Sequence, residues 1–240
     1  MKFVKCKDYD ECSKVASQIF IDAIKENPEV ILGLATGSSP IGIYKNLINE
    51  YENGNISFKD VKTYNLDEYV GISRENDQSY YYFMHDNLFN HVDIAEDNVH
   101  VPYAKEGAYE ESCKGYTDEL EKVCVDIQLL GIGANGHIGF NEPGTSFDQE
   151  TFIVELTEKT REDNKRFFKS IDEVPTHAIT MGIADIMRAK KIVLIACGEN
   201  KAEAVKKLLS KEVTTDFPAS ALHNHSDVVV VIDEAASKLV

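Results

Sequence analysis

One histidine and two carboxylates occupy positions suited to proton transfer. His137 lies in the glycine-rich stretch GIGANGHIGFNEPG, residues 131–144, with Asn135 before it and Glu142 after it. Histidine titrates near neutral pH, and a nearby carboxylate can orient an imidazole and stabilise its charge. Asp67 stands in VKTYNLDEYVG where an apolar strand should finish, and a partly desolvated carboxylate there can act as a general base. The alternative is that Asp67 only begins a turn, as acidic residues commonly do.

The glycines before His137 match the spacing of a dinucleotide-binding fingerprint, but the structural context of that motif is missing. The fingerprint requires a helix to open at its third glycine, so that the helix N-terminus faces a pyrophosphate. Here Gly136 is followed by another glycine and then by Pro143 and Gly144, which disfavour a helix. The pattern therefore indicates a long catalytic loop rather than an NAD site.

Hydroxyl groups and a glycine after another apolar run form a candidate site for one phosphate. In ILGLATGSSPIGIYKNL, a strand runs into Thr36, Gly37, Ser38 and Ser39, and a helix should begin at or near Pro40. Gly37 allows a tight turn, and the hydroxyls lie beside unpaired N–H groups of the helix N-terminus. The motif is not a Walker loop, because GK[ST] is missing. An ordinary serine-capped turn remains the alternative.

Each of these segments must be positioned by the elements around it. Apolar runs predict strands at 30–34, 61–66, 125–130, 152–156, 178–181, 192–196 and 228–232, and helical periodicity predicts helices at 9–25, 42–51, 78–89, 109–123 and 200–209. This alternation predicts a doubly wound, three-layer α/β/α fold (modified Rossmann-like) with a mostly parallel sheet. Sites in such sheets gather beyond the carboxyl ends of the strands. Without repeats or long linkers, residues 1–240 are expected to form a single domain.

Composition limits the partners of the chain. With 25 basic and 41 acidic residues the net charge is −16, which argues against nucleic acid or an anionic membrane as a partner. An anionic substrate would need local cations and helix N-termini. The longest apolar runs are strand-sized and MKFVKCKDYDEC has no apolar h-region, so a cytoplasmic location is expected. The five cysteines include no CxxC pair and are expected to be free thiols: Cys6, Cys12, Cys113, Cys124 and Cys197.

Several motifs together resemble one family. ATGSSP, NLDEYVG and GHIGFNEPG resemble the phosphate loop, the segment of the enolisation base and the ring-opening loop of the glucosamine-6-phosphate deaminases, also called glucosamine-6-phosphate isomerases. NKRFF and GENKAEAV resemble the segments that supply an arginine and a lysine to the substrate phosphate. The resemblance covers almost the whole chain, and several motifs in one order are more specific than any single one. The family fold is a doubly wound α/β structure.

The resemblance implies a mechanism. His137 would open the pyranose ring by moving a proton between the anomeric hydroxyl and the ring oxygen, positioned by Glu142. Asp67 would then take a proton from carbon 2 and return it to carbon 1 by way of an enolamine. Hydrolysis of the resulting imine would give fructose 6-phosphate and ammonia. The substrate carries its own amine and carbonyl, so neither a metal nor an organic cofactor is implied.

The resemblance also implies how the 6-phosphate is held and where this chain departs from the family. Residues 36–39 would cradle the phosphate, with Arg166 and Lys201 supplying positive charge. Asn135 stands where many members have an acidic residue. It can orient the imidazole but adds no charge, so the pKa of His137 should depend more on Glu142 than it does in those members. The segment GTSFDQETFIVEL contains none of the basic residues with which allosteric members bind N-acetylglucosamine 6-phosphate. We therefore expect no allosteric activator and a monomer rather than a hexamer.

Three other functions remain open. Galactosamine-6-phosphate deaminase is barely distinguished by sequence. A 6-phosphogluconolactonase shares the fold and a related loop, but it needs no carbon-2 base and lacks the glutamate after the histidine, so Asp67 and Glu142 favour the deaminase. A sugar-phosphate-sensing domain of a repressor would need a DNA-binding segment, and no basic helix-turn-helix precedes Val30.

Overall fold

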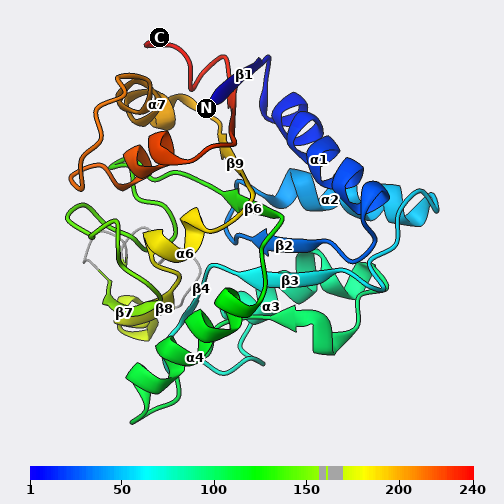
Figure 1. Ribbon diagram of the computed structural model, residues 1–240, viewed down its shortest axis with the longest axis vertical. Coiled ribbons are helices and arrows are strands. Elements are labelled where there is room, and N and C mark those ends of the chain that lie inside the picture. The colour runs from blue at the N-terminus through cyan, green and yellow to red at the C-terminus, as the bar shows by residue number, and fades with distance from the viewer. Residues whose placement is uncertain (157–160, 162–169) are drawn as a thin grey trace.

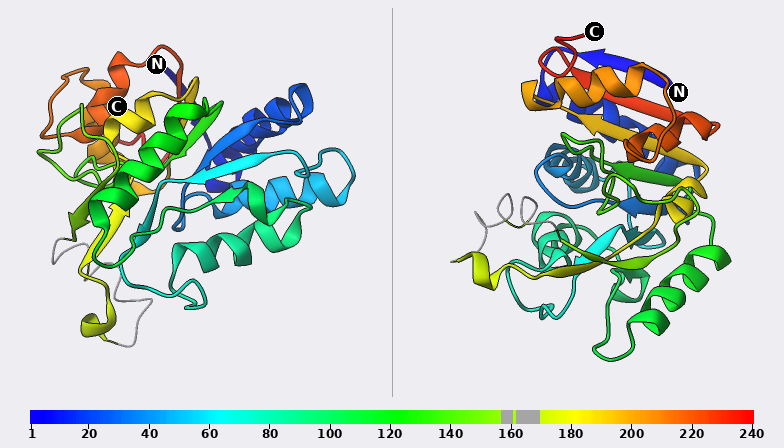
Figure 2. Two further views of the ribbon diagram at one scale, coloured as in Figure 1. Left: turned by 60° about the horizontal axis from the view of Figure 1, so that its bottom comes forward. Right: turned by 90° about the vertical axis from the view of Figure 1, so that its left-hand side faces the viewer.

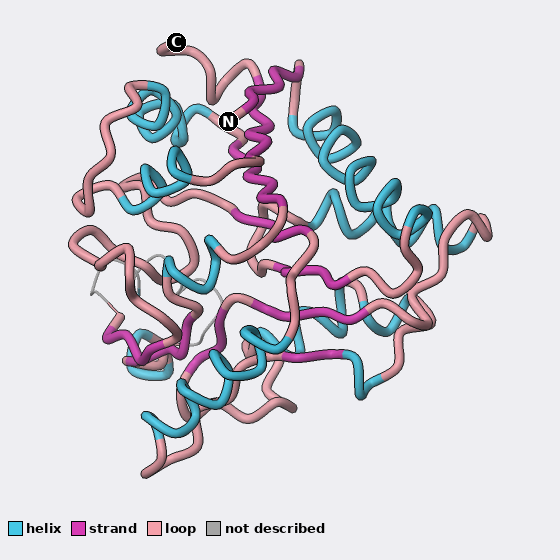
Figure 3. The backbone as a smooth tube through the Cα atoms, in the orientation of Figure 1, coloured by secondary structure: helices cyan, strands magenta, loops and turns pink. Residues whose placement is uncertain are grey.

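The main sheet of the protein consists of parallel strands. A computed structural model describes residues 1–156, 161 and 170–240, and within them seven strands pair in the order β1-β10-β9-β6-β2-β3-β5, each pair parallel (Figure 1). In Figure 3 these strands run as one band through the molecule. Their bounds are β1 Lys2–Cys6, β10 Val228–Asp233, β9 Lys191–Ala196, β6 Ile127–Leu130, β2 Ile31–Leu34, β3 Lys62–Asn65 and β5 Val99–His100.

Helices cover both faces of this sheet because connections between parallel strands are right-handed crossovers. Crossovers that lead from β1 toward β5 place α1, α2 and α3 on one face, and those that lead back toward β10 place α4, α6 and α7 on the other. Figure 1 shows α1 and α2 on one side and α4, α6 and α7 on the other, and Figure 2 gives two further views. The predicted three-layer α/β/α fold is confirmed. The helix bounds are α1 Tyr9–Glu26, α2 Ile41–Glu52, α3 Tyr80–Asn87, α4 Tyr109–Lys122, α6 Ile183–Met187 and α7 Ala202–Leu209.

The central strands are buried on both faces. All side chains of β6 and of residues 228–232 in β10 are buried, as are those of residues 192–196 in β9. The named parts of β9 and β10 are unbroken apolar runs because helices cover both sides, and β6 is apolar except at Gln128. Each fully buried leucine or phenylalanine, such as Leu129 or Phe20, contributes about 1.5–3 kcal/mol. No helix in the described part of the chain is long and apolar enough to cross a membrane.

A second, smaller sheet is antiparallel and was not expected from the sequence. It has the order β4-β8-β7, with bounds β4 Asp67–Tyr69, β8 His177–Thr180 and β7 Phe152–Glu155. The strands predicted at 152–156 and 178–181 therefore exist but leave the parallel sheet. Leu66 joins the two sheets, since its N–H donates to Leu34 O at 3.1 Å and its carbonyl accepts from Met181 N–H at 2.7 Å. This single residue separates β3 from β4 and sets the position of Asp67.

Two edge strands were also missed. β1 has the sequence KFVKC, in which lysines interrupt the apolar residues, and β5 is two residues long. Neither sequence pattern distinguishes a strand from a loop. β1 nevertheless pairs with β10 over its full length, with Cys6 opposite Asp233.

Candidate active site

Four neighbouring strands end at one edge of the main sheet, and each is followed by a segment that the sequence singles out. In the order β9, β6, β2 and β3, these strands lead to Lys201, to the loop that contains His137, to residues 36–39 and to Asp67. Carboxyl ends of parallel strands meet at one edge, which is where sites form in open α/β sheets. The topology therefore gathers residues that lie as far as 165 positions apart in the chain, from 36 to 201.

Asp67 is the first residue of β4 and is only 6% exposed. Within the described residues no donor hydrogen-bonds to its carboxylate. Desolvation by burial, together with the neighbouring charge of Glu68, raises the pKa of Asp67 to about 8. A carboxylate with this pKa is a strong enough base to remove a proton from a carbon atom. It is also partly ionised near neutral pH, as a base must be. Asp67 therefore has the environment of a general base, which favours that hypothesis over a turn residue.

Glu68 is adjacent in sequence but has a different environment. Its carboxylate accepts hydrogen bonds from the backbone N–H groups of Tyr69 at 2.8 Å and of Tyr80 and Tyr81 at 2.9 Å each. Tyr80 and Tyr81 open α3, so the carboxylate meets the positive end of that helix. Burial raises the pKa of Glu68, and these backbone hydrogen bonds oppose the rise. Glu68 thus anchors α3 beside Asp67, a role that sequence reasoning did not assign to it.

His137, Asn135 and Glu142 form a hydrogen-bonded chain. Nδ1 of His137 lies 2.8 Å from Oδ1 of Asn135, and the Asn135 amide donates from Nδ2 to Oε2 of Glu142 at 2.7 Å. Oε1 of Glu142 is 3.8 Å from Nδ1 of His137. Because Glu142 fixes which end of the amide donates, Oδ1 of Asn135 accepts and Nδ1 of His137 carries the proton. Nε2 then has the lone pair, which suits proton exchange with a substrate oxygen.

The glycine at position 133 makes room for the imidazole. A Cβ atom at Gly133 would lie 2.3 Å from Cε1 and Nδ1 of His137, closer than any real contact allows. The backbone also closes here, since Gly133 N–H donates to His137 O at 2.9 Å. This glycine of the apparent dinucleotide fingerprint therefore serves the packing of the His137 side chain.

Hydrogen bonds to β8 bring the His137 loop, residues 131–144, beside Asp67. Thr180 of β8 lies opposite Asp67 in the antiparallel pair, and its Oγ1 accepts from Phe140 N–H at 3.2 Å. A Cβ atom at Gly139 would lie 3.7 Å from Oδ2 of Asp67. The backbone of the loop thus passes the carboxylate of the candidate base.

Residues 36–39 form a turn that exposes donors, here called the phosphate loop. Gly37 has φ +90°, a conformation that side chains with a Cβ rarely adopt. Gly37 and Ser38 are exposed and Thr36 and Ser39 are partly buried. Pro40, which precedes α2, makes no side-chain capping hydrogen bond. The loop and the start of α2 therefore present N–H and hydroxyl groups suited to an anion.

Tyr9, which sequence reasoning did not single out, holds the phosphate loop in place. Its hydroxyl proton is shared between the carbonyls of Ser38 and Ser39, each 3.1 Å away, and its oxygen accepts from Gly42 N–H at 2.8 Å. Tyr9 is the first residue of α1, about 30 positions from its partners. No local motif marks such a contact, so only the fold reveals it.

The two predicted cations are placed differently. Lys201 ends a short 3-10 helix, Glu199–Lys201, that follows β9, and its N–H donates to Gly198 O at 3.0 Å. It is partly buried at the same sheet edge as the phosphate loop. Arg166 lies outside the residues that the structure describes. Among the described residues, no group of three or more His, Cys, Asp or Glu side chains could hold a metal ion.

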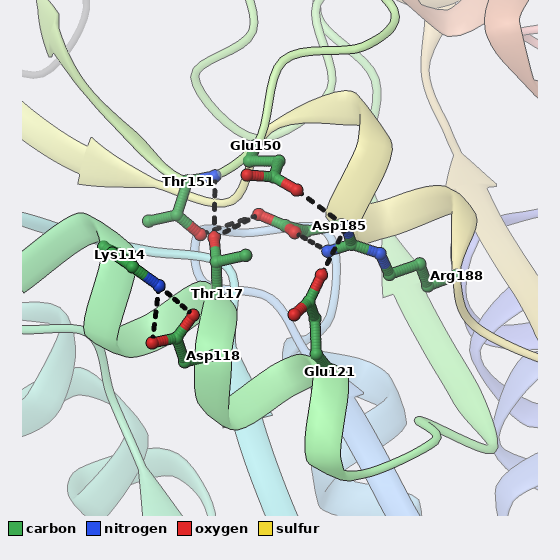
Figure 4. A network of polar contacts seen from close by, with 8 residues as sticks. All are labelled: Lys114, Thr117, Asp118, Glu121, Glu150, Thr151, Asp185 and Arg188. Carbon is green, nitrogen blue, oxygen red and sulfur yellow. Dashed lines mark hydrogen bonds and ion pairs between the residues drawn. The ribbon is translucent and has the colours of Figure 1, made fainter.

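A second polar cluster lies elsewhere, where α4, the segment before β7 and α6 meet (Figure 4). Asp185 accepts from Thr151 Oγ1 at 2.7 Å and from Thr117 Oγ1 at 3.3 Å, and it pairs with Arg188. Arg188 also pairs with Glu121 and Glu150. A cavity of about 900 Å³ adjoins this cluster and is lined by α4 and residues 146–153. It contains none of the predicted site residues and carries five carboxylates, so it does not suit an anionic substrate.

Comparison with known proteins relates the whole chain to one family. A family model described as glucosamine-6-phosphate isomerases/6-phosphogluconolactonase matches residues 9–231. A glucosamine-6-phosphate deaminase from a Thermoanaerobacter species is 52% identical over 100% of this chain and 95% of its own length, and one from Clostridium perfringens is 51% identical over 100% and 99%.

Solved structures relate the chain to the same family. A monomeric glucosamine-6-phosphate deaminase is similar with a TM-score of 0.97 at 48% identity, over 100% of both chains. The 6-phosphogluconolactonase of Trypanosoma brucei has a TM-score of 0.78 at 17% identity, over 99% of this chain and 97% of its own. At that identity the likeness concerns the fold alone.

Proposed function

The chain belongs to the glucosamine-6-phosphate isomerase and 6-phosphogluconolactonase family, and we propose that it is a glucosamine-6-phosphate deaminase. It converts glucosamine 6-phosphate and water to fructose 6-phosphate and ammonia. The observation that carries this proposal is the environment of Asp67, which is buried, has a pKa of about 8 and lies beside the His137 loop. Hydrolysis of a lactone requires no base at carbon 2, whereas isomerisation of an aldose does.

In the proposed mechanism, ring opening comes first. Nε2 of His137 accepts the proton of the anomeric hydroxyl and returns a proton to the ring oxygen, which opens the pyranose to the aldehyde. Asn135 and Glu142 hold the imidazole in the Nδ1–H tautomer, which the hydrogen bonds to the Asn135 amide support. Glu142 also stabilises the imidazolium that forms in passing, because its carboxylate lies 3.8 Å from Nδ1.

Isomerisation and loss of ammonia follow. Asp67 removes the proton from carbon 2 of the open chain, giving an enolamine, and then returns the proton to carbon 1. The product is an imine at carbon 2, which water hydrolyses to the ketone and ammonia. Since Asp67 must be ionised to begin, its elevated pKa supports transfer in both directions near neutral pH.

The 6-phosphate binds at the phosphate loop in this proposal. Backbone N–H groups and the hydroxyls of Thr36, Ser38 and Ser39 supply hydrogen bonds, and Lys201 and Arg166 supply charge. The conformation of Gly37 and the clamp of Tyr9 support a preformed site. Such local donors are needed because the net charge of −16 repels an anion at long range.

The proposal also covers the domain organisation, the oligomeric state and the location of the protein. We infer that residues 1–240 act as one domain and as a monomer; the 48% identical relative, which is described as monomeric, supports the second inference. The absence of lysine and arginine from residues 144–156 supports an enzyme without an anionic allosteric activator. A phosphorylated sugar carries charge and does not cross a membrane unaided, so we infer that the protein acts in the cytoplasm.

The decisive experiment measures ammonia and fructose 6-phosphate from purified protein supplied with glucosamine 6-phosphate. Galactosamine 6-phosphate and 6-phosphogluconolactone are offered in parallel assays, and Asp67→Asn is compared with Asp148→Asn, an exposed carboxylate outside the site. We expect both products in equal amounts, loss of turnover only in Asp67→Asn, and the highest kcat/KM with the glucosamine substrate. Faster hydrolysis of the lactone, or binding without turnover, would assign the protein to one of the alternatives.

A further inference from the structure

Three aromatic side chains pack together outside the main core. Tyr69 ends β4, Tyr80 is the first residue of α3, and Phe140 lies in the His137 loop. The ring centroid of Tyr80 is 4.8 Å from that of Tyr69 and 6.2 Å from that of Phe140, and the planes of Tyr80 and Phe140 are only 7° apart. The centroids of Tyr69 and Phe140 are 6.3 Å apart. Aromatic rings attract each other at such distances, so the three rings form one packed unit, here called the aromatic cluster.

The register of the smaller sheet puts this cluster on the face that carries Asp67. Side chains of alternate residues in a strand point to the same face, so Asp67 and Tyr69 share one face of β4. Their partners on β8, Thr180 and Ala178, share that face, and Ala178 packs with the aromatic cluster. Phe140 reaches the same face from the His137 loop, since its N–H donates to Thr180 Oγ1 at 3.2 Å. The carboxylate and the rings are therefore neighbours on one surface of the sheet.

Tyr80 connects the two segments that carry the proton-transfer groups. Its backbone N–H donates to Oε1 of Glu68 at 2.9 Å, which fixes the start of α3 to the residue next to Asp67. Its ring packs on Phe140 of the His137 loop. The residue before Phe140 is Gly139, where a Cβ atom would lie 3.7 Å from Oδ2 of Asp67. Tyr80 thus holds β4 through its backbone and the loop through its side chain, at the point where the loop passes the carboxylate.

We propose that Tyr80 is a positioning residue for the deaminase reaction. Its ring holds the His137 loop against β4, so that His137 and Asp67 can act on one bound sugar and water is kept away from Asp67. This inference rests on the function proposed above, because both groups need a substrate on which to act. Tyr80 acts through the packing of its ring, and its hydroxyl group is not required.

Shielding from water determines what happens to the proton that Asp67 removes. When the bond between carbon 2 and hydrogen breaks, its electron pair forms the double bond between carbons 1 and 2, the proton joins the carboxylate, and the carbonyl oxygen takes up another proton. In the return step the carboxyl O–H bond breaks, a bond to hydrogen forms at carbon 1, and the nitrogen lone pair forms the C=N bond at carbon 2. Water in contact with the carboxyl group would exchange the proton between these steps. Since Asp67 is only 6% exposed, much of the proton should reach carbon 1.

The first test compares three variants in steady-state kinetics. Tyr80→Leu removes the flat ring, Tyr80→Phe keeps it, and Tyr82→Leu changes an exposed tyrosine of the same helix as a matched control. We expect kcat of Tyr80→Leu to fall roughly 10- to 100-fold, because the two proton-transfer groups are misplaced. KM should change less than about threefold, since the change does not touch the phosphate loop. Tyr80→Phe should restore kcat to within about threefold of the wild type, and Tyr82→Leu should match the wild type.

Inhibition by inorganic phosphate separates positioning from general damage to the site. Phosphate should compete with the substrate at the phosphate loop, and its inhibition constant should be the same in Tyr80→Leu and in the wild type. A weaker inhibition that accompanies the loss of kcat would show that the whole site has changed, and would overturn the proposal. An equal loss in Tyr80→Phe, or full turnover in Tyr80→Leu, would also overturn it. Absence of turnover in the wild type would instead refute the proposed function.

The second test follows the transferred proton. Glucosamine 6-phosphate with deuterium at carbon 2 is converted in ordinary water to low extent, and nuclear magnetic resonance measures the deuterium at carbon 1 of the fructose 6-phosphate. The wild type, Tyr80→Phe and Tyr82→Leu should transfer equal fractions, and Tyr80→Leu should transfer severalfold less because water reaches Asp67. A variant that only folded less well would make less product without changing this fraction. An unchanged fraction in Tyr80→Leu, or no deuterium at carbon 1 in the wild type, would refute the shielding of Asp67.

Discussion

Asp67 and Asp185 are equally buried, each 6% exposed, but they lie in opposite environments. Asp185 accepts hydrogen bonds from two threonine hydroxyls and pairs with Arg188. Burial raises the pKa of Asp185, and Thr151 and Arg188 oppose part of this rise. The carboxylate of Asp67 receives no hydrogen bond within the described chain, and the charge that acts on its pKa, that of Glu68, is also negative. Burial raises the pKa of both carboxyl groups, yet only Asp185 has partners that hold its pKa down.

The difference separates a carboxylate suited to a structural role from one suited to proton transfer. A buried polar group without a partner costs free energy, and the rest of the fold must tolerate that cost. Such a group is available to a substrate because no protein group competes for its lone pairs. Asp67 is therefore expected to matter for turnover and Asp185 for stability, and each of the following changes tests that division.

The largest expected effect is on turnover. Asp67→Asn preserves size but removes the base, and we expect kcat to fall about 10³-fold, within the range that positioned general bases contribute. The free energy of unfolding at neutral pH should not decrease, because no hydrogen bond of the carboxylate is lost. Steady-state kinetics and urea denaturation of the same preparation measure both. A variant that loses stability as well as activity would show that Asp67 is partnered after all.

The converse change should affect stability. Asp185→Ala leaves Thr117, Thr151 and Arg188 without their shared acceptor, and we expect the free energy of unfolding to fall by about 2–4 kcal/mol. Since this cluster contains none of the predicted site residues, kcat/KM of the protein that remains folded should change less than about threefold. Denaturant unfolding and kinetics at low temperature check this prediction. A large loss of kcat/KM in folded protein would contradict the division.

The pH dependence sharpens the comparison. The pKa of Asp67 in the folded protein, about 8, is above its ordinary value of 3.8, so the folded state binds the proton more tightly. The resulting stabilisation is fully present below pH 3.8 and is lost as the pH rises through 8. Between pH 6 and 9 the wild type should therefore lose about 2.7 kcal/mol relative to Asp67→Asn. Over the same range kcat/KM should increase with pH until Asp67 is ionised. Parallel stability curves for the two proteins would disprove the elevated pKa.

Glu142 is intermediate between Asp67 and Asp185, and its replacement should have the smallest effect of these changes. It is a site carboxylate that has a partner, since Asn135 donates to it. Glu142→Gln keeps a hydrogen bond to Asn135 but removes the negative charge near Nδ1 of His137, and we expect kcat to fall about tenfold. Nuclear magnetic resonance titration of His137 should show a lower imidazole pKa in Glu142→Gln. Asn135→Asp, which adds a charge, should move this pKa in the opposite direction, and an unchanged value in both variants would refute the role assigned to Glu142.

Sequence predicted those parts of the fold and site that have local patterns. The central strands at 125–130, 192–196 and 228–232 are apolar runs, and the phosphate loop and His137 loop are defined by glycine, hydroxyl and turn residues. β4 escaped prediction because only Leu66 separates it from β3, without a turn signal. Its antiparallel pairing with β8 depends on residues more than 100 positions away.

Side-chain environments escaped prediction for a similar reason. The sequence marks Asp67 as an acidic residue at a strand end, but it does not show that Glu68 takes the helix N-terminal N–H groups of α3 while Asp67 receives none. Tyr9 carries no signal at all, because its partners in the phosphate loop lie about 30 residues away. Such contacts depend on how distant segments pack, which local periodicity does not encode.

The backbone of Leu66 makes the position of Asp67 depend on both sheets being formed. Its N–H is held by the parallel sheet and its carbonyl by the segment after β8, so Asp67 has no fixed position until both sheets have formed. A chain that had assembled only its larger sheet would have most of its secondary structure and no base at carbon 2. Recovery of enzymatic activity during refolding should thus require both sheets, whichever of them forms second, and can be compared with the recovery of circular dichroism.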